Sequence, residues 1–352
     1  WVTELKNLLS GMFYGLALLA IWPALAPKRS RSKRLPEENE KQARSAIPLT
    51  IFQLGLGTLL FACALYSKSI TASLPAALAI ALWFAQGNIR RSQIAILIPL
   101  LLLGALAGWQ TASMEREHVG AIGDDWNYGF VERVGIASRC VVHYIQQCSV
   151  PFEQMFFYPR YEPKLSATAL LAILACFTIA ISLAIYTWKQ RKRGAISSVA
   201  FFVGSALPAL GFLNVYPHRF SFVADHFVYL PVIGVFCFVW SILLDGAKFV
   251  CRDFKIRPPL CLLAFVAILC VYCFQTMRYE PVFESEKTLW TDTIKKNPSS
   301  VAALQNLALV YVRENDPDGA LFYLEKAEEY KFDRFQTLNS KGLVLGMQGR
   351  VI

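Results

Sequence analysis

The stretch from Tyr216 to Gly234 reads Y-P-H-R-F-S-F-V-A-D-H-F-V-Y-L-P-V-I-G, a short polar loop that runs directly into an apolar segment. It places one arginine, one aspartate and two of the four histidines at the end of a candidate membrane span: Arg219, Asp225, His218 and His226. Ionisable groups at the edge of hydrocarbon are rare and usually mark a substrate or ion path, so we expect a functional site here. The alternative is a solvated loop in which Tyr229 anchors the chain at the membrane interface.

The composition predicts a membrane protein. Hydrophobic residues make up 55% of the 352 residues and charged residues only 17%, which is far from the balance of a soluble enzyme of this length. A formal net charge of +10 would suit a nucleic-acid partner, but the lysines and arginines are gathered into short runs between apolar stretches. That distribution follows the positive-inside rule, so it indicates membrane topology and no nucleic-acid partner.

Eight apolar stretches are candidate membrane spans. They cover residues 8–25, 47–66, 70–84, 94–109, 165–188, 196–213, 228–244 and 260–273. Four basic clusters, at 28–44, 90–91, 189–193 and 248–257, all fall on one side of the membrane when the first is placed in the cytoplasm. The opposite side then holds residues 1–7, 67–69, 110–164, 214–227 and everything after about residue 275.

The spans predict an all-α fold with two parts. Residues 1–276 form a multi-span helical membrane domain, whose outer loop is 110–164, and residues 277–352 form a soluble helical region. The chain starts at Trp1 rather than Met and stops at Ile352 within a helical pattern, so we expect it to be an internal piece of a longer protein.

The outer loop contains a predicted amphipathic helix from Phe130 to Cys148. Its apolar positions recur at steps of three and four residues, at Val131, Val134, Val141, Ile145 and Cys148. Such a helix either lies flat on the membrane surface or packs against neighbouring spans. Asp124 and Asp125 precede it, and this acidic pair is either catalytic, metal-binding or simply solvated; no other metal site is evident.

The C-terminal region has the pattern of a tetratricopeptide repeat. Residues 301–334 place small and large apolar side chains at the expected positions, namely Leu307, Ala308, Tyr311, Ala320, Leu324 and Ala327. Gly342 follows Ala308 by 34 residues, one repeat period, and residues 285–297 read as the second helix of a preceding unit. Because a single unit cannot bury its own apolar face, we expect further repeats after Ile352. Such arrays usually bind peptides or proteins.

Four short motifs in order resemble one family. They are W-V-T-E-L-K-N-L-L-S from Trp1, S-K-S with S-L-P over residues 67–75, M-F-F-Y-P over 155–159, and A-D-H-F-V-Y-L-P over 224–231. Together they are similar to membrane proteins with tetratricopeptide repeats that are related to the protein O-mannosyltransferases, integral-membrane glycosyltransferases of the GT-C type. Two positions depart from the family pattern, because His226 stands where an arginine is usual and Leu5 where an arginine is common.

The resemblance implies a transferase that moves a sugar from a polyprenyl-phosphate-linked donor to a protein serine or threonine, or another hydroxyl, outside the cytoplasm. It implies that the main catalytic acid lies in spans upstream of this chain, with Asp225 and Glu4 as the carboxylates present here. It implies no cofactor beyond the lipid-linked donor. It also implies a bacterial inner membrane with periplasmic repeats that bind the acceptor, or alternatively the endoplasmic reticulum membrane with lumenal repeats.

Within that resemblance, the outer face offers four groups for the donor phosphate: Lys6, Lys68, Arg219 and His226. Asp225, Tyr229 and Tyr158 are the expected contacts to the sugar or acceptor. The alternative for the lysines is that they extend to the interface from the ends of spans, and the alternative for Asp225 is a structural ion pair with Arg219.

Two other functions remain open. An O-antigen ligase or polymerase also combines many spans with a large outer loop, and it would depend on Arg133, Arg139 and His143. A non-catalytic membrane anchor would only present the repeats to partner proteins.

Overall fold

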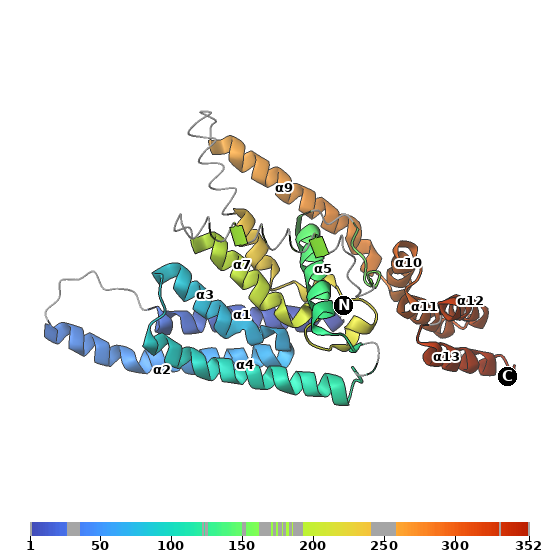
Figure 1. The fold of residues 1–352 in the computed structure, drawn as a ribbon, viewed down its shortest axis with the longest axis horizontal. Helices are drawn as coiled ribbons and strands as arrows, with labels where there is room; N and C mark the ends of the chain where they lie inside the picture. Colours follow the sequence, from blue (N-terminus) through green and yellow to red (C-terminus); the bar gives the residue numbers. More distant parts are fainter. Residues whose placement is uncertain are drawn as a thin grey trace. The chain divides into compact units, whose positions relative to one another are not determined.

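The computed structural model describes residues 2–26, 36–121, 123, 126–149, 153–161, 193–240, 258–330 and 332–350, with scattered positions between 170 and 185. Every regular element among these residues is helical (Figure 1). The chain forms two compact units. The first contains residues 1–127, 165–216 and 226–246, and the second contains 128–164, 217–225 and 247–352.

Among the described residues, four helical segments are long and apolar enough to cross a membrane: Leu5–Leu25, Pro48–Ser67, Ser69–Gln86 and Arg91–Glu117. The first two lie in α1 (Val2–Leu25) and α2 (Pro36–Ser67). The third joins the short helix η1 (Ser69–Ser73) to α3 (Leu74–Gln86), and the fourth is α4 (Arg91–Glu117). These segments confirm the helices predicted at 8–25, 47–66, 70–84 and 94–109.

Helices α1 and α2 approach closely because α2 has a glycine at the contact. A β-carbon added at Gly57 would stand 2.3 Å from Cγ1 of Ile21 on α1. Small residues allow such close helix packing in membranes, where dispersion contacts replace the hydrophobic effect between helices. The core of the unit also contains Tyr14, Phe61, Leu74, Leu78, Leu82 and Leu230.

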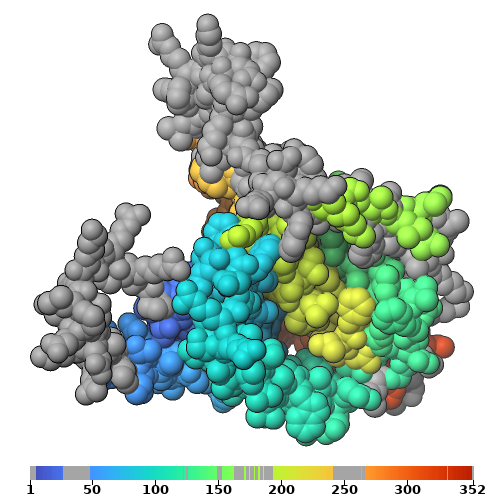
Figure 2. Space-filling view, turned by 60° about the vertical axis from the view of Figure 1, so that its left-hand side comes forward, coloured from blue at the N-terminus to red at the C-terminus, as the bar shows by residue number. Residues whose placement is uncertain are grey.

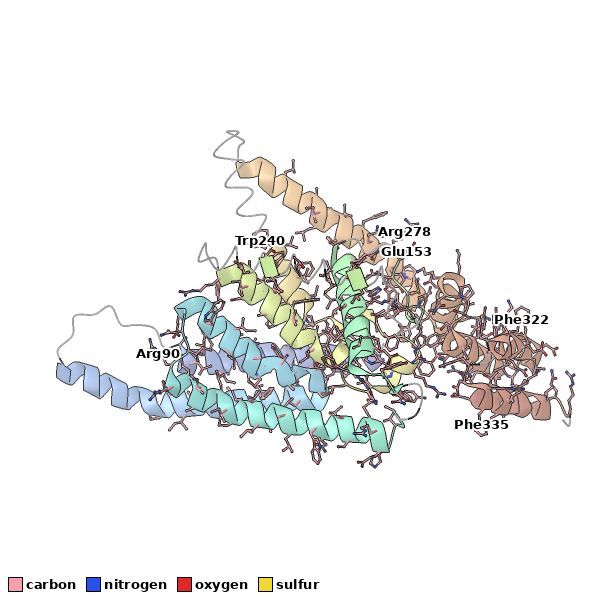
Figure 3. The ribbon with its side chains drawn as sticks, in the orientation of Figure 1. Arg90, Glu153, Trp240, Arg278, Phe322 and Phe335 are labelled. Carbon is pink, nitrogen blue, oxygen red and sulfur yellow. The ribbon has the colours of Figure 1, made fainter. Side chains whose placement is uncertain are left out.

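The start of α4 is tied to the end of α1. Arg90 precedes α4 and is labelled in Figure 3. Its backbone N–H donates to Oε1 of Gln93, and the Gln93 amide donates to the Leu25 carbonyl at 2.8 Å. The helices α3 and α4 lie side by side, as the adjoining light-blue and teal surfaces in Figure 2 show.

The predicted span at 196–213 is shorter in the structure. Helix α7 runs from Arg193 to Ala206, and the 3₁₀ turn η3 (Leu207–Ala209) follows it. Pro208 has no backbone N–H to continue the helix, and Gly211 has a positive φ of 87° that turns the chain away. The prediction of one continuous span was therefore wrong at its C-terminal end.

Other predictions for the membrane domain lie wholly or largely outside the described residues. These are the stretch 165–188, the end of 228–244 and most of the basic clusters at 28–44, 189–193 and 248–257. The last apolar stretch is the helix α9 (Pro258–Tyr279) in the second unit. Many of its large apolar side chains are exposed, including Leu263, Leu269, Val271 and Phe274.

The second unit contains the predicted outer-loop helix. Helix α5 runs from Phe130 to Ser149, which confirms the helix expected at 130–148. Its buried face is formed by Ile136, Ala137, Cys140 and Tyr144. In the predicted apolar stripe, Val131 and Ile145 are exposed, whereas Val134, Val141 and Cys148 are half-buried.

Four helices complete the second unit: α10 (Glu286–Lys296), α11 (Val301–Arg313), α12 (Pro317–Glu329) and α13 (Arg334–Met347). Side chains of Ser285, Ser300 and Asp316 accept backbone N–H groups at the starts of α10, α11 and α12. Consecutive helices pack together around Leu304, Leu307, Ala308, Ala320, Leu324 and Ala327. Phe322 on α12 and Phe335 on α13 remain exposed (Figure 3).

Candidate functional site

Some of the polar side chains predicted from the sequence lie in two clusters, one in each unit. In the first unit we define the Lys68 cluster as Asn7, Ser10, Lys68, His226 and Tyr229. In the second unit we define the Asp225 cluster as His143, Tyr144, Gln147, Tyr158 and Asp225. Each cluster joins residues that are far apart in the sequence.

Lys68 lies in the break between α2 and η1. Its φ of −163° is extended, so the helix stops there and the side chain leaves the helix surface. The ammonium donates to Oδ1 of Asn7 at 2.5 Å and to the backbone carbonyl of His226 at 3.4 Å. It also lies 4.9 Å from the centre of the Tyr229 ring, a cation–π distance. Two segments distant from Lys68 in the sequence thus hold its ammonium group.

Tyr229 is held in turn by α1. Its hydroxyl lies 2.7 Å from Oγ of Ser10, which donates to the Asn7 carbonyl at 2.9 Å. Asn7 and Ser10 are three residues apart and share one face of α1, and both are buried. The cluster therefore presents an ammonium group beside an aromatic ring, an arrangement suited to a phosphate or another anion.

The Asp225 cluster is centred on a largely buried carboxylate. The Tyr158 hydroxyl donates to Oδ1 of Asp225 at 2.8 Å. The His143 ring packs edge-on against the Tyr158 ring at 4.4 Å between centroids. His143 and Tyr144 lie on the same side of α5 as Gln147, because residues three and four apart lie close on a helix surface.

Burial raises the pKa of Asp225 to about 6, although the hydrogen bond from Tyr158 and the charge of Lys296 both favour the ionised form. Lys296 is fixed nearby by the Gln154 carbonyl and the Asp292 carboxylate, each at 2.7 Å. Burial and then the Asp225 charge raise the pKa of Tyr158, so this hydroxyl stays protonated and donates. A carboxylate titrating near neutral pH is suited to accept a proton.

Aromatic residues fix the segment that carries Tyr158. Phe157 stacks on Trp290 of α10 at 5.9 Å, and Phe156 meets the same indole edge-on at 5.2 Å. The Asn297 amide donates to the Phe157 carbonyl at 3.0 Å. The end of α10 thus positions Tyr158, and through it the carboxylate of Asp225.

His218 and Arg219 have structural contacts. Burial, followed by the charges of Arg160 and Arg133, lowers the pKa of His218 to about 4, so its ring is neutral near pH 7. Arg219 forms an ion pair with Asp333 at 3.2 Å and lies 5.5 Å from the Phe332 ring. The ion pair that was considered between Arg219 and Asp225 is thus replaced, among the described contacts, by one to Asp333.

The remaining predicted site residues are more scattered. Lys6 is exposed on α1, and the side chains of Glu4, Asp124 and Asp125 lie outside the described residues. Arg133 donates to the Tyr128 carbonyl at 3.2 Å, and the Arg139 guanidinium lies 5.1 Å from the Tyr161 ring. The described part of the chain contains no group of three His, Cys, Asp or Glu side chains that would hold a metal ion.

Sequence reasoning missed several residues of the two clusters. Asn7 and Ser10 were quoted only as part of a motif, although their spacing of three on a predicted helix points to a shared face. Gln147 follows His143 by four residues, which is the same signal on α5. Asp333 and Lys296 have no sequence signal that links them to Arg219 and Asp225, because tertiary packing brings them together.

Comparison of the chain with known protein families, with curated proteins and with solved structures finds no match.

Proposed function

We propose that this chain belongs to a polytopic membrane glycosyltransferase of the GT-C type, which transfers a sugar from a polyprenyl-phosphate-linked donor to an acceptor hydroxyl outside the cytoplasm. The observation that supports this most is the 2.8 Å hydrogen bond between Tyr158 and Asp225, which are 67 residues apart. It joins two of the four motifs that resemble this family, F-Y-P and A-D-H.

The remaining motifs support the same proposal from within the first unit. Asn7 and Ser10 belong to the first motif, Lys68 to the second and Tyr229 to the fourth. The 2.5 Å and 2.7 Å contacts of these side chains bring the three motifs together at one end of the apolar helices. Polar groups that converge in this way at span ends are costly unless they bind something.

Each cluster offers groups suited to one part of the proposed chemistry. In the reaction, an acceptor hydroxyl attacks the anomeric carbon, the bond to the phosphate oxygen breaks, and the proton passes to a carboxylate while the phosphate leaves on the lipid. We assign to Lys68 the stabilisation of the departing phosphate, with Lys6 and His226 as the other predicted groups of the first unit. We assign to Asp225, with Tyr158, the contact to the sugar or the acceptor.

The proposal includes the position of the protein. The apolar helices cross a bacterial inner membrane, or alternatively that of the endoplasmic reticulum, and the helices α10 to α13 lie on the outer side as tetratricopeptide repeats. Their role is to bind the acceptor protein. The capped helices and small buried residues Ala308, Ala320 and Ala327 are consistent with such repeats.

Replacement of Asp225 tests the proposal. In the complete protein, we expect Asp225→Asn to lower sugar transfer from a lipid-linked donor ~10-fold or more, because the charged contact to the sugar or acceptor is lost. The amount of protein in the membrane fraction should not change. Asp318→Asn, which alters an exposed carboxylate on α12, serves as the control. Undiminished transfer by the Asp225 variant contradicts the proposal.

A second candidate is an O-antigen ligase or polymerase, and one observation favours it. His143, the histidine expected to matter in such an enzyme, packs against Tyr158 in the same cluster as Asp225. Loss of activity in Arg133 and Arg139 variants, together with retained activity in Asp225→Asn, would favour this candidate. A non-catalytic anchor would tolerate all of these substitutions.

A further inference from the structure

Helix α5 turns three polar side chains toward the interior of the second unit. His143, Tyr144 and Gln147 follow one another on the same side of the helix, and Tyr144 is fully buried. Their neighbours Val142 and Ile145, on other sides of α5, are exposed apolar residues. This is the reverse of the usual pattern for a helix at a protein surface, where the polar side chains face outward.

This side of α5 adjoins the tyrosine that binds the Asp225 carboxylate. The His143 ring lies 4.4 Å from the ring of Tyr158, whose hydroxyl donates to Asp225 at 2.8 Å. Burial and then the charge of Asp225 raise the pKa of Cys148, to about 11, so the last turn of α5 lies close to this carboxylate. Residues 143–148 therefore form one side of the Asp225 cluster.

Three polar atoms of this side are buried without a hydrogen bond in the described part of the chain: Nε2 of His143, the Tyr144 hydroxyl and Oε1 of Gln147. The atoms of His143 and Gln147 are the two that lie one helical turn apart. Buried polar atoms are nearly always hydrogen-bonded in proteins, and each exception calls for an explanation. Two such atoms lie one helical turn apart, and His143 contacts Tyr158, the hydrogen-bond donor to Asp225. They indicate that this side of α5 meets a polar ligand.

The available groups specify the chemistry of that ligand. The Asp225 carboxylate repels an anion, while its oxygens and Oε1 of Gln147 accept hydrogen bonds. A hydroxyl both donates and accepts, so it satisfies Nε2 of His143 in either tautomer. The Tyr158 ring adds an apolar surface for C–H groups. A ring that carries several hydroxyls and apolar C–H faces, such as a hexose, meets all of these requirements.

We propose that His143 and Gln147 hydrogen-bond the hydroxyls of the transferred sugar, so that α5 forms the sugar-binding wall beside Asp225. This inference rests on the proposed glycosyltransferase function and extends it to two residues that the sequence motifs do not include. The sugar ring packs beside Tyr158, and the lipid-linked phosphate lies outside this wall.

Two binding probes test the inference on the purified complete protein: a short-chain isoprenyl phosphate carrying mannose, and the same isoprenyl phosphate without the sugar. We expect His143→Phe and Gln147→Leu each to weaken binding of the sugar-bearing probe ~10-fold, measured by calorimetry. Binding of the sugar-free probe should stay unchanged. Gln146→Leu, at the exposed neighbouring position, serves as the matched control and should bind both probes normally.

Thermal melting separates this result from misfolding. Because both substitutions remove a buried polar atom that lacks a partner, the variants should melt at or above the temperature of the unaltered protein. Unchanged binding of the sugar-bearing probe by both variants overturns the sugar-binding wall and leaves the transferase proposal standing. Failure of the unaltered protein to bind either probe overturns the transferase proposal, and the wall with it.

Discussion

At the scale of single residues, Asp225 is the most informative position. The carboxylate is largely removed from water, and its pKa rises to about 6 because burial outweighs the help of Tyr158 and Lys296. The folded protein therefore holds a proton on Asp225 more tightly than the unfolded chain does. Ionised Asp225 lowers the stability of the fold, which is the usual condition of a group kept for function.

The sign of this effect predicts a pH-dependent stability difference between the protein and its Asp225→Asn variant. Below the ordinary pKa of 3.8 the Asp225 carboxyl group is neutral in both the folded and the unfolded protein, so it does not change the free energy of unfolding. As pH rises toward 6, ionisation of Asp225 lowers the free energy of unfolding progressively. Above pH 6 the loss reaches its full size, about 3 kcal/mol for this change in pKa. We therefore expect the variant to gain melting temperature over the unaltered protein as pH rises from 4 to 8.

The side-chain oxygen of the asparagine still accepts the hydrogen bond from Tyr158. The difference in melting temperature therefore reports the loss of the carboxylate charge and not the loss of this bond. Asp318→Asn on the exposed surface of α12 should show no such trend across the same pH range. A melting difference for Asp225→Asn that stays constant between pH 4 and 8 would mean that Asp225 is solvated in the folded protein.

Part of the candidate site could be predicted from the sequence. Asp225, Tyr158, Lys68 and Tyr229 stand in short motifs, and the structure brings them together in pairs. Arg219 shows the limit of this reasoning. Its ion-pair partner Asp333 lies 114 residues further along the chain, and only the packing of α13 places it there.

At the scale of elements, the sequence identified helices better than the faces they bury. The apolar periodicity of α5 predicted the helix, but Val131 and Ile145 of the predicted stripe are exposed, while Cys140 and Tyr144 are buried. The stripe is determined by hydrophobicity alone. The buried face depends on the partners that α5 meets, which include Tyr161 and Phe222, and periodicity carries no information about them.

The contact between α1 and α2 gives an element-scale prediction. Gly57→Val should lower the free energy of unfolding by about 1–3 kcal/mol, because the new side chain overlaps Ile21 and the helices must separate. Gly55→Val is the matched control, since a β-carbon there meets nothing within 4 Å. Melting temperatures in detergent measure both. Equal losses would attribute the effect to helix propensity rather than to the contact.

At the scale of the whole molecule, composition predicted an all-helical chain with apolar spans, and four such helices are present in the described residues. The sequence division into 1–276 and 277–352 remains a prediction about a membrane boundary, whereas the two compact units reflect packing. The units combine segments that are distant in sequence, which hydropathy cannot reveal because it is a local property.

Membrane sidedness supplies the prediction at this scale. In a variant without native cysteines, Tyr66→Cys and Phe335→Cys should react with a membrane-impermeant maleimide from the same side of sealed vesicles. Arg90→Cys should react only from the other side, because the basic residues lie in the cytoplasm. Tyr66 and Phe335 are highly exposed, at 96% and 87%, so the reagent has access to them. Labelling of Tyr66→Cys and Arg90→Cys from one side would contradict the topology, and permeabilised vesicles provide the control.

The aromatic packing of Phe156 and Phe157 against Trp290 limits where the chain can be truncated. A fragment that begins at residue 277 would contain the whole predicted repeat region. It would lack the phenylalanines that pack on the Trp290 indole and the Arg219 guanidinium that pairs with Asp333. To stay soluble, such a fragment would need polar substitutions at Trp290 and a neutral residue in place of Asp333. Alternatively, the segments 128–164 and 217–225 could be supplied as separate peptides.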